Sequence, residues 1–354
     1  MGIWVQQDTG SRVDRIPTWI LVALVLVVTL LKSGFATKSP VVWELENFPL
    51  PVSERGQTSS FGLRTLGYFF QTESQATYWL IAVAMTLLVM GLAVAALLAS
   101  PIGSVTSRRL SVVVVLGGPL VWTVLREYHG LDPWVLAGSV IIASLSWGRI
   151  GFLVGLSLML LGNPEQALVA MVALGIASLI PALRQWQPRA FIGLAVATIV
   201  VAAVSAVTYN LGGTSRLSMV RQYAIEGGGY FFSWGYLGLY AGLGLAPLFA
   251  IAIWLHSKRT ITGIFMLGAF CVPVLFTMVT LDQSRVLVGT SSLLAVTVTL
   301  VSLPIVLDWL DQHNLDGPLV VLVTVLLLPV VHIEYPSVVR PGWLVFTEFL
   351  GSYV

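Results

Sequence analysis

Residues 286–307 read VLVGTSSLLAVTVTLVSLPIVL and contain no charged side chain. At ~1.5 Å per residue, a helix of this length is about as long as the ~30 Å hydrocarbon core of a membrane is thick. Similar apolar runs recur along the chain, separated by short polar segments. The pattern predicts helices near residues 17–33, 77–100, 110–125, 133–147, 150–162, 165–183, 189–208, 234–255, 261–280, 286–307 and 317–332. We therefore expect an all-α polytopic membrane protein with about eleven transmembrane helices in one bundle.

The composition favours one membrane domain over several soluble ones. Of the 354 residues, 57% are hydrophobic and 10% are charged, and the mean hydropathy is +0.91. A soluble domain needs more charge to cover its surface. The net charge of +2 is spread over short loops, which excludes the basic footprint of a nucleic-acid-binding protein. We expect a single transmembrane domain over residues 1–354, with outer loops at 34–76 and 209–233 and no separate soluble domain.

The distribution of Lys and Arg predicts the orientation of the chain. One set of short loops is basic, and short basic loops stay in the cytoplasm. These loops carry Arg108–Arg109, Arg149, Arg184 with Arg189, and Lys258–Arg259. We therefore expect the N-terminus inside and the C-terminus outside. The chain has no Asn-x-Ser/Thr acceptor, which fits the cytoplasmic membrane of a prokaryote.

Two N-terminal segments need separate interpretation. The first apolar stretch begins only at Ile16, after a polar segment, and is predicted to be a membrane span rather than a cleaved signal peptide. Farther on, aromatic and aliphatic residues between Phe61 and Phe70 surround Arg64. They predict an interfacial helix in the first outer loop, with a re-entrant cap packed on the bundle as the alternative.

Carboxylates stand at the start of several predicted helices on the outer side. Asp132, Glu165 and Asp282 each lie at or just before a helix N-terminus. Their structural explanation is that an acid in the first turn complements the helix dipole. Their functional explanation is that ionisable groups at membrane depth are costly and mark a site.

Arginines accompany these acids and predict a phosphate site. Arg126, Arg216, Arg221 and Arg285 fall on the same side, with His129 and Gln166 beside them. The guanidinium group binds phosphate oxygens through two parallel hydrogen bonds and stays charged when it is desolvated. The alternative is that Arg216 and Arg221 bind lipid headgroups. No helix-borne metal motif or nucleotide-binding loop is present, so we predict no cofactor and leave room only for a weakly bound divalent cation.

The layout resembles two families of membrane enzymes. A first span followed by a long acidic outer loop is similar to GT-C-class glycosyltransferases, which use polyprenyl-phosphate-linked sugars. That resemblance implies a catalytic base among Glu44, Glu46 and Glu54, although the usual Asp or Asp-Asp/Asp-Glu is missing there. Arg216, ten further residues and Gly227 resemble the arginine-bearing loops of Wzy-type polysaccharide polymerases.

These observations predict a membrane glycosyltransferase or glycan polymerase at the extracytoplasmic face. The donor would be a polyprenyl-(di)phosphate-linked sugar, and the acceptor a glycan or lipid-linked hydroxyl. Glu165, Asp282 and Asp132 are the preferred acids, and the four arginines are the preferred phosphate ligands. One alternative is a transporter or flippase of a lipid-linked or anionic substrate, which needs polar groups at mid-membrane. The other is a non-catalytic membrane assembly partner, which needs no convergent acids and arginines.

Overall fold

The computed structural model describes residues 11–33, 75–126, 132–210, 239–240, 242–279, 283–329, 333–334 and 338–339. These residues form twelve α-helices, two short 3-10 helices and one pair of two-residue antiparallel strands. The α-helices are α1 Thr18–Ser33, α4 Gln75–Leu98, α5 Val105–Gly117, α6 Pro119–Arg126, α7 Asp132–Ser144, α8 Gly148–Gly162, α9 Pro164–Ala177, α10 Gln187–Asn210, α12 Ala246–Ser257, α13 Thr260–Met278, α14 Gln283–Gln312 and α15 Gly317–Leu327. The remaining elements are η1 Val13–Arg15, η2 Pro181–Trp186, β1 Ile333–Glu334 and β2 Val338–Val339.

The predicted helical character is confirmed, since every predicted segment contains at least one of these helices. Two segments differ from the prediction. The segment 110–125 is divided into α5 and α6 at Gly118–Pro119, because proline supplies no amide proton to continue the helix. The segment 234–255 is interrupted before Ala246, so that α12 is only its second part. The interfacial helix predicted near 61–70 lies outside the described residues.

Three helices of the described chain are long and apolar enough to cross a membrane. They comprise residues Pro181–Val207, Thr260–Met278 and Val286–Gln312. The other apolar helices are shorter. Membrane association is therefore supported by length and composition.

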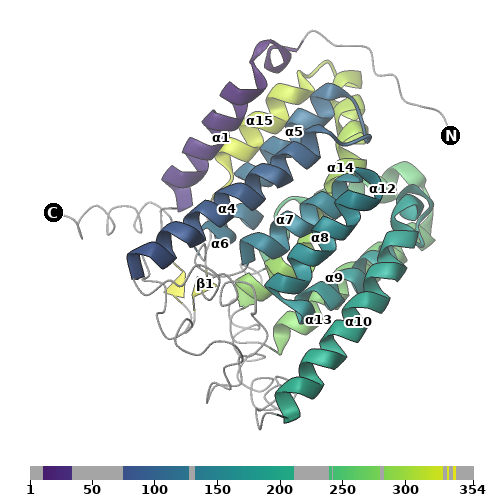
Figure 1. The fold of residues 1–354 in the computed structure, drawn as a ribbon. Helices are drawn as coiled ribbons and strands as arrows, with labels where there is room; N and C mark the ends of the chain where they lie inside the picture. The colour runs from purple at the N-terminus through teal and green to yellow at the C-terminus, as the bar shows by residue number, and fades with distance from the viewer. Residues whose placement is uncertain are drawn as a thin grey trace.

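Helix α14 forms the centre of the bundle and packs against α5, α7, α9, α12 and α13 (Figure 1). Its residues from Leu287 to Leu300 are all buried. The peripheral helices instead expose large apolar side chains: Trp19 of α1 is 72% exposed, Leu87 of α4 69%, Ile150 of α8 70% and Ile199 of α10 69%. A bundle with a buried centre and an apolar outer surface is suited to contact with lipid rather than water.

Helices α5 and α10 begin at one end of the bundle, which we call the basic end because Arg108, Arg109 and Arg189 lie there. These guanidinium groups bind backbone carbonyls near chain turns. Arg108 Nη1 donates to the Ser100 carbonyl at 3.1 Å. Arg189 Nη2 donates to the Gly148 carbonyl at 2.9 Å. The basic residues of these loops therefore form hydrogen bonds with the backbone near helix ends, in addition to carrying charge.

Asp316 fixes the start of α15 at the same end. Its carboxylate accepts hydrogen bonds from the Leu319 amide at 3.2 Å and from the Ser11 hydroxyl at 2.8 Å. Burial alone would raise the pKa of this carboxyl. The Ser11, Leu319 and Arg12 hydrogen bonds and the Arg12 charge outweigh burial, so its pKa lies below the ordinary value of 3.8.

We expect this N-cap to make the stability of the protein pH-dependent in the acid range. Because the folded pKa is lower than the unfolded pKa, the stabilisation is fully present above 3.8 and is lost as the pH falls through the folded value. Asp316→Ala should cost about 1 kcal/mol at neutral pH. Asp316→Asn keeps an oxygen that can accept the Ser11 and Leu319 hydrogen bonds but lacks the negative charge, so it should be less stable than wild type at neutral pH and should lose the acid dependence. Thermal unfolding in detergent across this pH range measures both effects, and an Asn variant as acid-sensitive as wild type would contradict the assignment.

Candidate functional site

Helices α7, α9 and α14 begin at the opposite end of the bundle, which we call the acidic end because Asp132 and Glu165 lie there. The start of α9 is specified locally. Asn163 caps it, its side chain accepting from the Gln166 amide at 3.0 Å, and Pro164 occupies the first turn. Glu165 is therefore held in the first turn of α9, and Asp132 is the first residue of α7. Both side chains are partly exposed.

Gln166 joins the start of α9 to the start of α14. Its side chain is only 4% exposed and packs against Gly289 of α14. A methyl group at Gly289 would overlap the Gln166 amide, so glycine is what lets the two helices approach this closely. Within the described part of the chain, Gln166 Oε1 has no hydrogen-bond partner. A buried, unpaired amide oxygen costs free energy, about 1–3 kcal/mol.

A second polar contact joins α14 to α7 one layer deeper. The Ser292 hydroxyl donates to Ser139 Oγ at 2.9 Å, and both side chains are fully buried. Ser139 in turn contacts Met159 Sδ of α8 at 3.7 Å. The start of α14 is therefore flanked by α7 on one side and α9 on another. The N-terminal ends of helices carry a partial positive charge, which favours a bound anion.

The structure places only some of the predicted site residues. Asp132, Glu165 and Gln166 are described and lie at the acidic end. Arg126 ends α6 and Arg285 lies in the first turn of α14, but their side chains are not among those described. The remaining predicted site residues lie outside the described residues: Glu44, Glu46, Glu54, His129, Arg216, Arg221 and Asp282. The convergence of carboxylates and guanidiniums in one hollow therefore stays a prediction.

Lys32 is a cation at the acidic end that the sequence analysis did not select. It lies at the end of α1, and Nζ donates to the Leu328 carbonyl at 2.9 Å beyond α15. It also lies 5.6 Å from the centre of the Trp122 ring. Trp122 precedes Arg126 by one helical turn, so Lys32 and Arg126 belong to neighbouring helix ends. In the sequence, Lys32 is recognisable as a single cation at the end of an apolar run.

No group of three His, Cys, Asp or Glu side chains that could hold a metal ion occurs in the described ranges. Comparison of the chain with protein-family models, curated proteins and solved structures gave no match.

Proposed function

We propose that this chain is an integral membrane glycosyltransferase or glycan polymerase that uses a polyprenyl-(di)phosphate-linked sugar at the extracytoplasmic face. In this proposal the chain crosses the cytoplasmic membrane of a prokaryote about eleven times. The N-terminus and the basic end face the cytoplasm, and the acidic end faces outward.

The unpaired amide oxygen of Gln166, packed on Gly289 next to Glu165, is the observation that carries this proposal within the described part of the chain. A buried hydrogen-bonding group without a partner costs free energy. That cost is recovered when a ligand supplies the partner. Sugar hydroxyls both donate and accept, so they satisfy a carboxamide in either orientation of its oxygen and nitrogen. The adjacent helix N-termini favour the phosphate of the donor.

The proposed reaction is a displacement at the anomeric carbon. The acceptor hydroxyl oxygen forms a bond to that carbon, and the bond from carbon to phosphate oxygen breaks. The phosphate leaves with the electron pair, and a carboxylate takes the hydroxyl proton. Glu165, Asp282 and Asp132 are the candidate bases, with Glu44, Glu46 and Glu54 implied by the family resemblance. Binding of the leaving phosphate is assigned to Arg126, Arg216, Arg221 and Arg285, with His129 and Gln166 contacting the sugar.

Purified protein in proteoliposomes, mixed with a radiolabelled polyprenyl-linked sugar and a hydroxyl acceptor, tests the proposal. We expect a labelled glycan that forms with wild type and is lost in Arg126→Ala and Arg285→Ala. Arg259→Ala at the basic end is the matched control, because it removes the same charge far from the proposed site. If wild type forms no product but moves the labelled lipid across the vesicle membrane, the glycosyltransferase proposal is contradicted and the protein is a flippase.

A transporter is the second candidate, and one structural feature favours it. Two helices are interrupted part-way along their length, between α5 and α6 and before α12. Interrupted helices at mid-membrane are typical of secondary transporters, where they line substrate and ion sites.

A further inference from the structure

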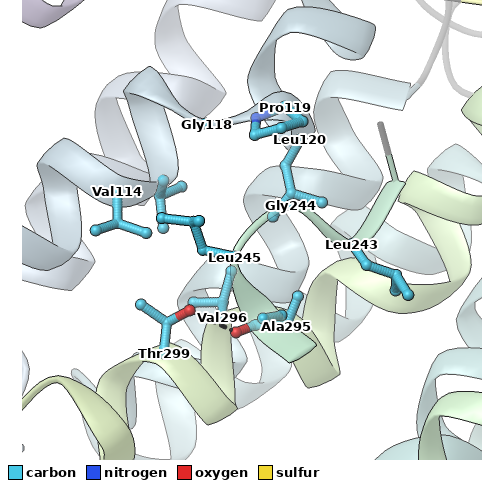
Figure 2. Close-up of a pocket in the computed structure, with 12 residues that line it drawn as sticks. Val114, Gly118, Pro119, Leu120, Leu243, Gly244, Leu245, Ala295, Val296 and Thr299 are labelled. Carbon is cyan, nitrogen blue, oxygen red and sulfur yellow. Dashed lines mark hydrogen bonds between the residues drawn. The ribbon is translucent and has the colours of Figure 1, made fainter. Parts of the chain in front are cut away.

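The pocket beside Pro119 and Gly244 does not suit a charged ligand. Figure 2 shows its lining, which consists of aliphatic side chains and glycines with the hydroxyl group of Thr299. No charged side chain is among the lining residues. A charged ligand is therefore expected at the surface of the bundle, where arginine side chains are exposed.

The turn between α7 and α8, at the basic end, has a strained backbone. Leu145 and Trp147 both adopt a φ of +57°, and Trp147 immediately precedes α8. Residues other than glycine rarely occupy this left-handed region. Such a conformation costs free energy and persists only where the surrounding structure holds it in place.

Hydrogen bonds from η2 and α10 hold this turn. Trp186 Nε1 donates to the Ala143 carbonyl at 3.0 Å. Arg189 donates through Nη1 to the Ile142 carbonyl at 3.2 Å and through Nη2 to the Gly148 carbonyl at 2.9 Å. These contacts place the start of α10 beside the start of α8.

Two arginines next to these contacts are exposed. Arg149 directly follows Gly148, and Arg184 lies five residues before Arg189, which is about 8–10 Å along a helical chain. Neither Arg149 nor Arg184 makes a side-chain hydrogen bond or an ion pair in the structure as far as it is described. Their guanidinium groups are therefore available to a ligand.

No acid on the same elements balances this charge. The sequences of α8, η2 and α10 contain Arg149, Arg184 and Arg189 but no Asp or Glu. Electrostatic attraction extends over about 8 Å at physiological ionic strength. The three guanidinium groups therefore attract an anion together, even where only one of them touches it.

Large apolar side chains lie next to the arginines on the same two helices. On α8, Ile150 is 70% exposed and Leu153 61%; on α10, Phe191 is 50% exposed and Ile192 55%. Figure 1 shows α10 at the outer edge of the bundle. Trp147, 42% exposed, joins the charged and the apolar parts, as tryptophan does at a membrane interface.

This combination restricts the class of ligand. A phospholipid presents a phosphate group to the arginines and acyl chains to the apolar side chains. A soluble acidic protein or a free phosphate would match only the charged part. Since the arginines carry an unbalanced positive charge, a headgroup with a net negative charge fits better than a zwitterionic one.

We propose that the surface formed by Trp147, Arg149, Ile150, Arg184 and Phe191, which we call the lipid surface, binds an anionic phospholipid. The hydrogen-bonded turn holds Trp147 and Arg149 at the level of the headgroup. This inference shares with the proposed function the position of the chain in a membrane. It does not depend on glycosyl transfer.

Quenching of Trp147 by brominated lipids tests the lipid surface. The full chain is reconstituted in phosphatidylcholine vesicles with an increasing fraction of brominated phosphatidylglycerol or brominated phosphatidylcholine. The difference between wild type and Trp147→Phe isolates the fluorescence of Trp147. We expect half-maximal quenching at a lower fraction of brominated phosphatidylglycerol than of brominated phosphatidylcholine.

Two variants test the role of the charges. Arg149→Gln and Arg184→Gln should each reduce the preference for phosphatidylglycerol by about fivefold, the usual contribution of one Lys or Arg near an anionic membrane surface. Each variant is compared with its own Trp147→Phe counterpart. Both side chains are exposed, so neither substitution should prevent folding.

Arg259→Gln is the matched control. It removes an exposed arginine at the basic end, just before α13 and outside the lipid surface, and should keep the preference. Equal quenching of Trp147 by the two brominated lipids would overturn the proposal. A preference that survives in both Arg149→Gln and Arg184→Gln would overturn it as well. No sugar donor is present, so these outcomes are independent of the proposed glycosyl transfer.

Discussion

Replacing Glu165 by Gln is expected to lower the rate of glycosyl transfer by about 100-fold to 10,000-fold, the usual effect of removing a general base. Glutamine has the shape of glutamate but cannot take the acceptor proton. The loss should appear mainly in kcat, since the carboxylate acts on the transition state rather than on binding of the donor. Initial rates with a labelled polyprenyl-linked sugar, measured over a range of donor concentrations, separate the two parameters.

The same substitution distinguishes catalysis from a purely structural role. If Glu165 only complements the dipole of α9, its loss should cost about 0.3–1 kcal/mol of stability and leave kcat close to wild type. Asp311→Asn near the end of α14 is the control for loss of one acid at the basic end. A Glu165→Gln protein that is less stable but fully active would remove Glu165 from the chemistry and leave Asp282 and Asp132 as the candidate bases.

Gly289→Ala is expected to lower the stability of the bundle through a contact that one named side chain controls. The new methyl group would occupy the position of the Gln166 amide, so this buried side chain would have to leave its place. Overpacking of this kind costs about 1–3 kcal/mol. The fall in Tm in detergent, followed by tryptophan fluorescence, measures it.

A double mutant tests whether the Gln166 contact is the cause. Gln166→Ala removes the obstructing amide, so Gly289→Ala should be far less damaging in that background than in wild type. Gly175→Ala in α9 is the control, because a Cβ there meets nothing within 4 Å. It should be neutral or slightly stabilising, since alanine favours helix over glycine. Equal costs of Gly289→Ala in the two backgrounds would show that Gln166 is not the obstacle.

The positions of the helices could be predicted from the sequence because each apolar run is bounded by polar residues. The interruptions could not be predicted in the same way. Gly118–Pro119 lies inside an apolar run that is long enough for one helix, so hydrophobicity alone joins α5 to α6. Only the missing amide of the proline divides them. The same reason applies before α12, where Gly244 and Pro247 lie within a continuous apolar run.

The residues of the candidate site were partly predictable. Asn163, Pro164 and Glu165 form a local signal for a helix start, and the structure begins α9 there. The contact of Gln166 with Gly289 joins segments far apart in the chain, and no local pattern indicates it. Lys32 was missed because its partners, Leu328 and Trp122, are likewise distant in sequence.

The central position of α14 has a consequence for biosynthesis. The hydroxyl groups that join it to earlier helices come from late residues: Ser291 donates to the Gly242 carbonyl at 2.9 Å, Ser292 to Ser139, and Ser302 to the Phe249 carbonyl at 2.8 Å. Until the ribosome has made α14, the earlier helices surround an unfilled axis and cannot reach their final packing. A premature stop codon before residue 283 would therefore yield a chain without its central packing partner, and we expect membrane proteases to degrade it.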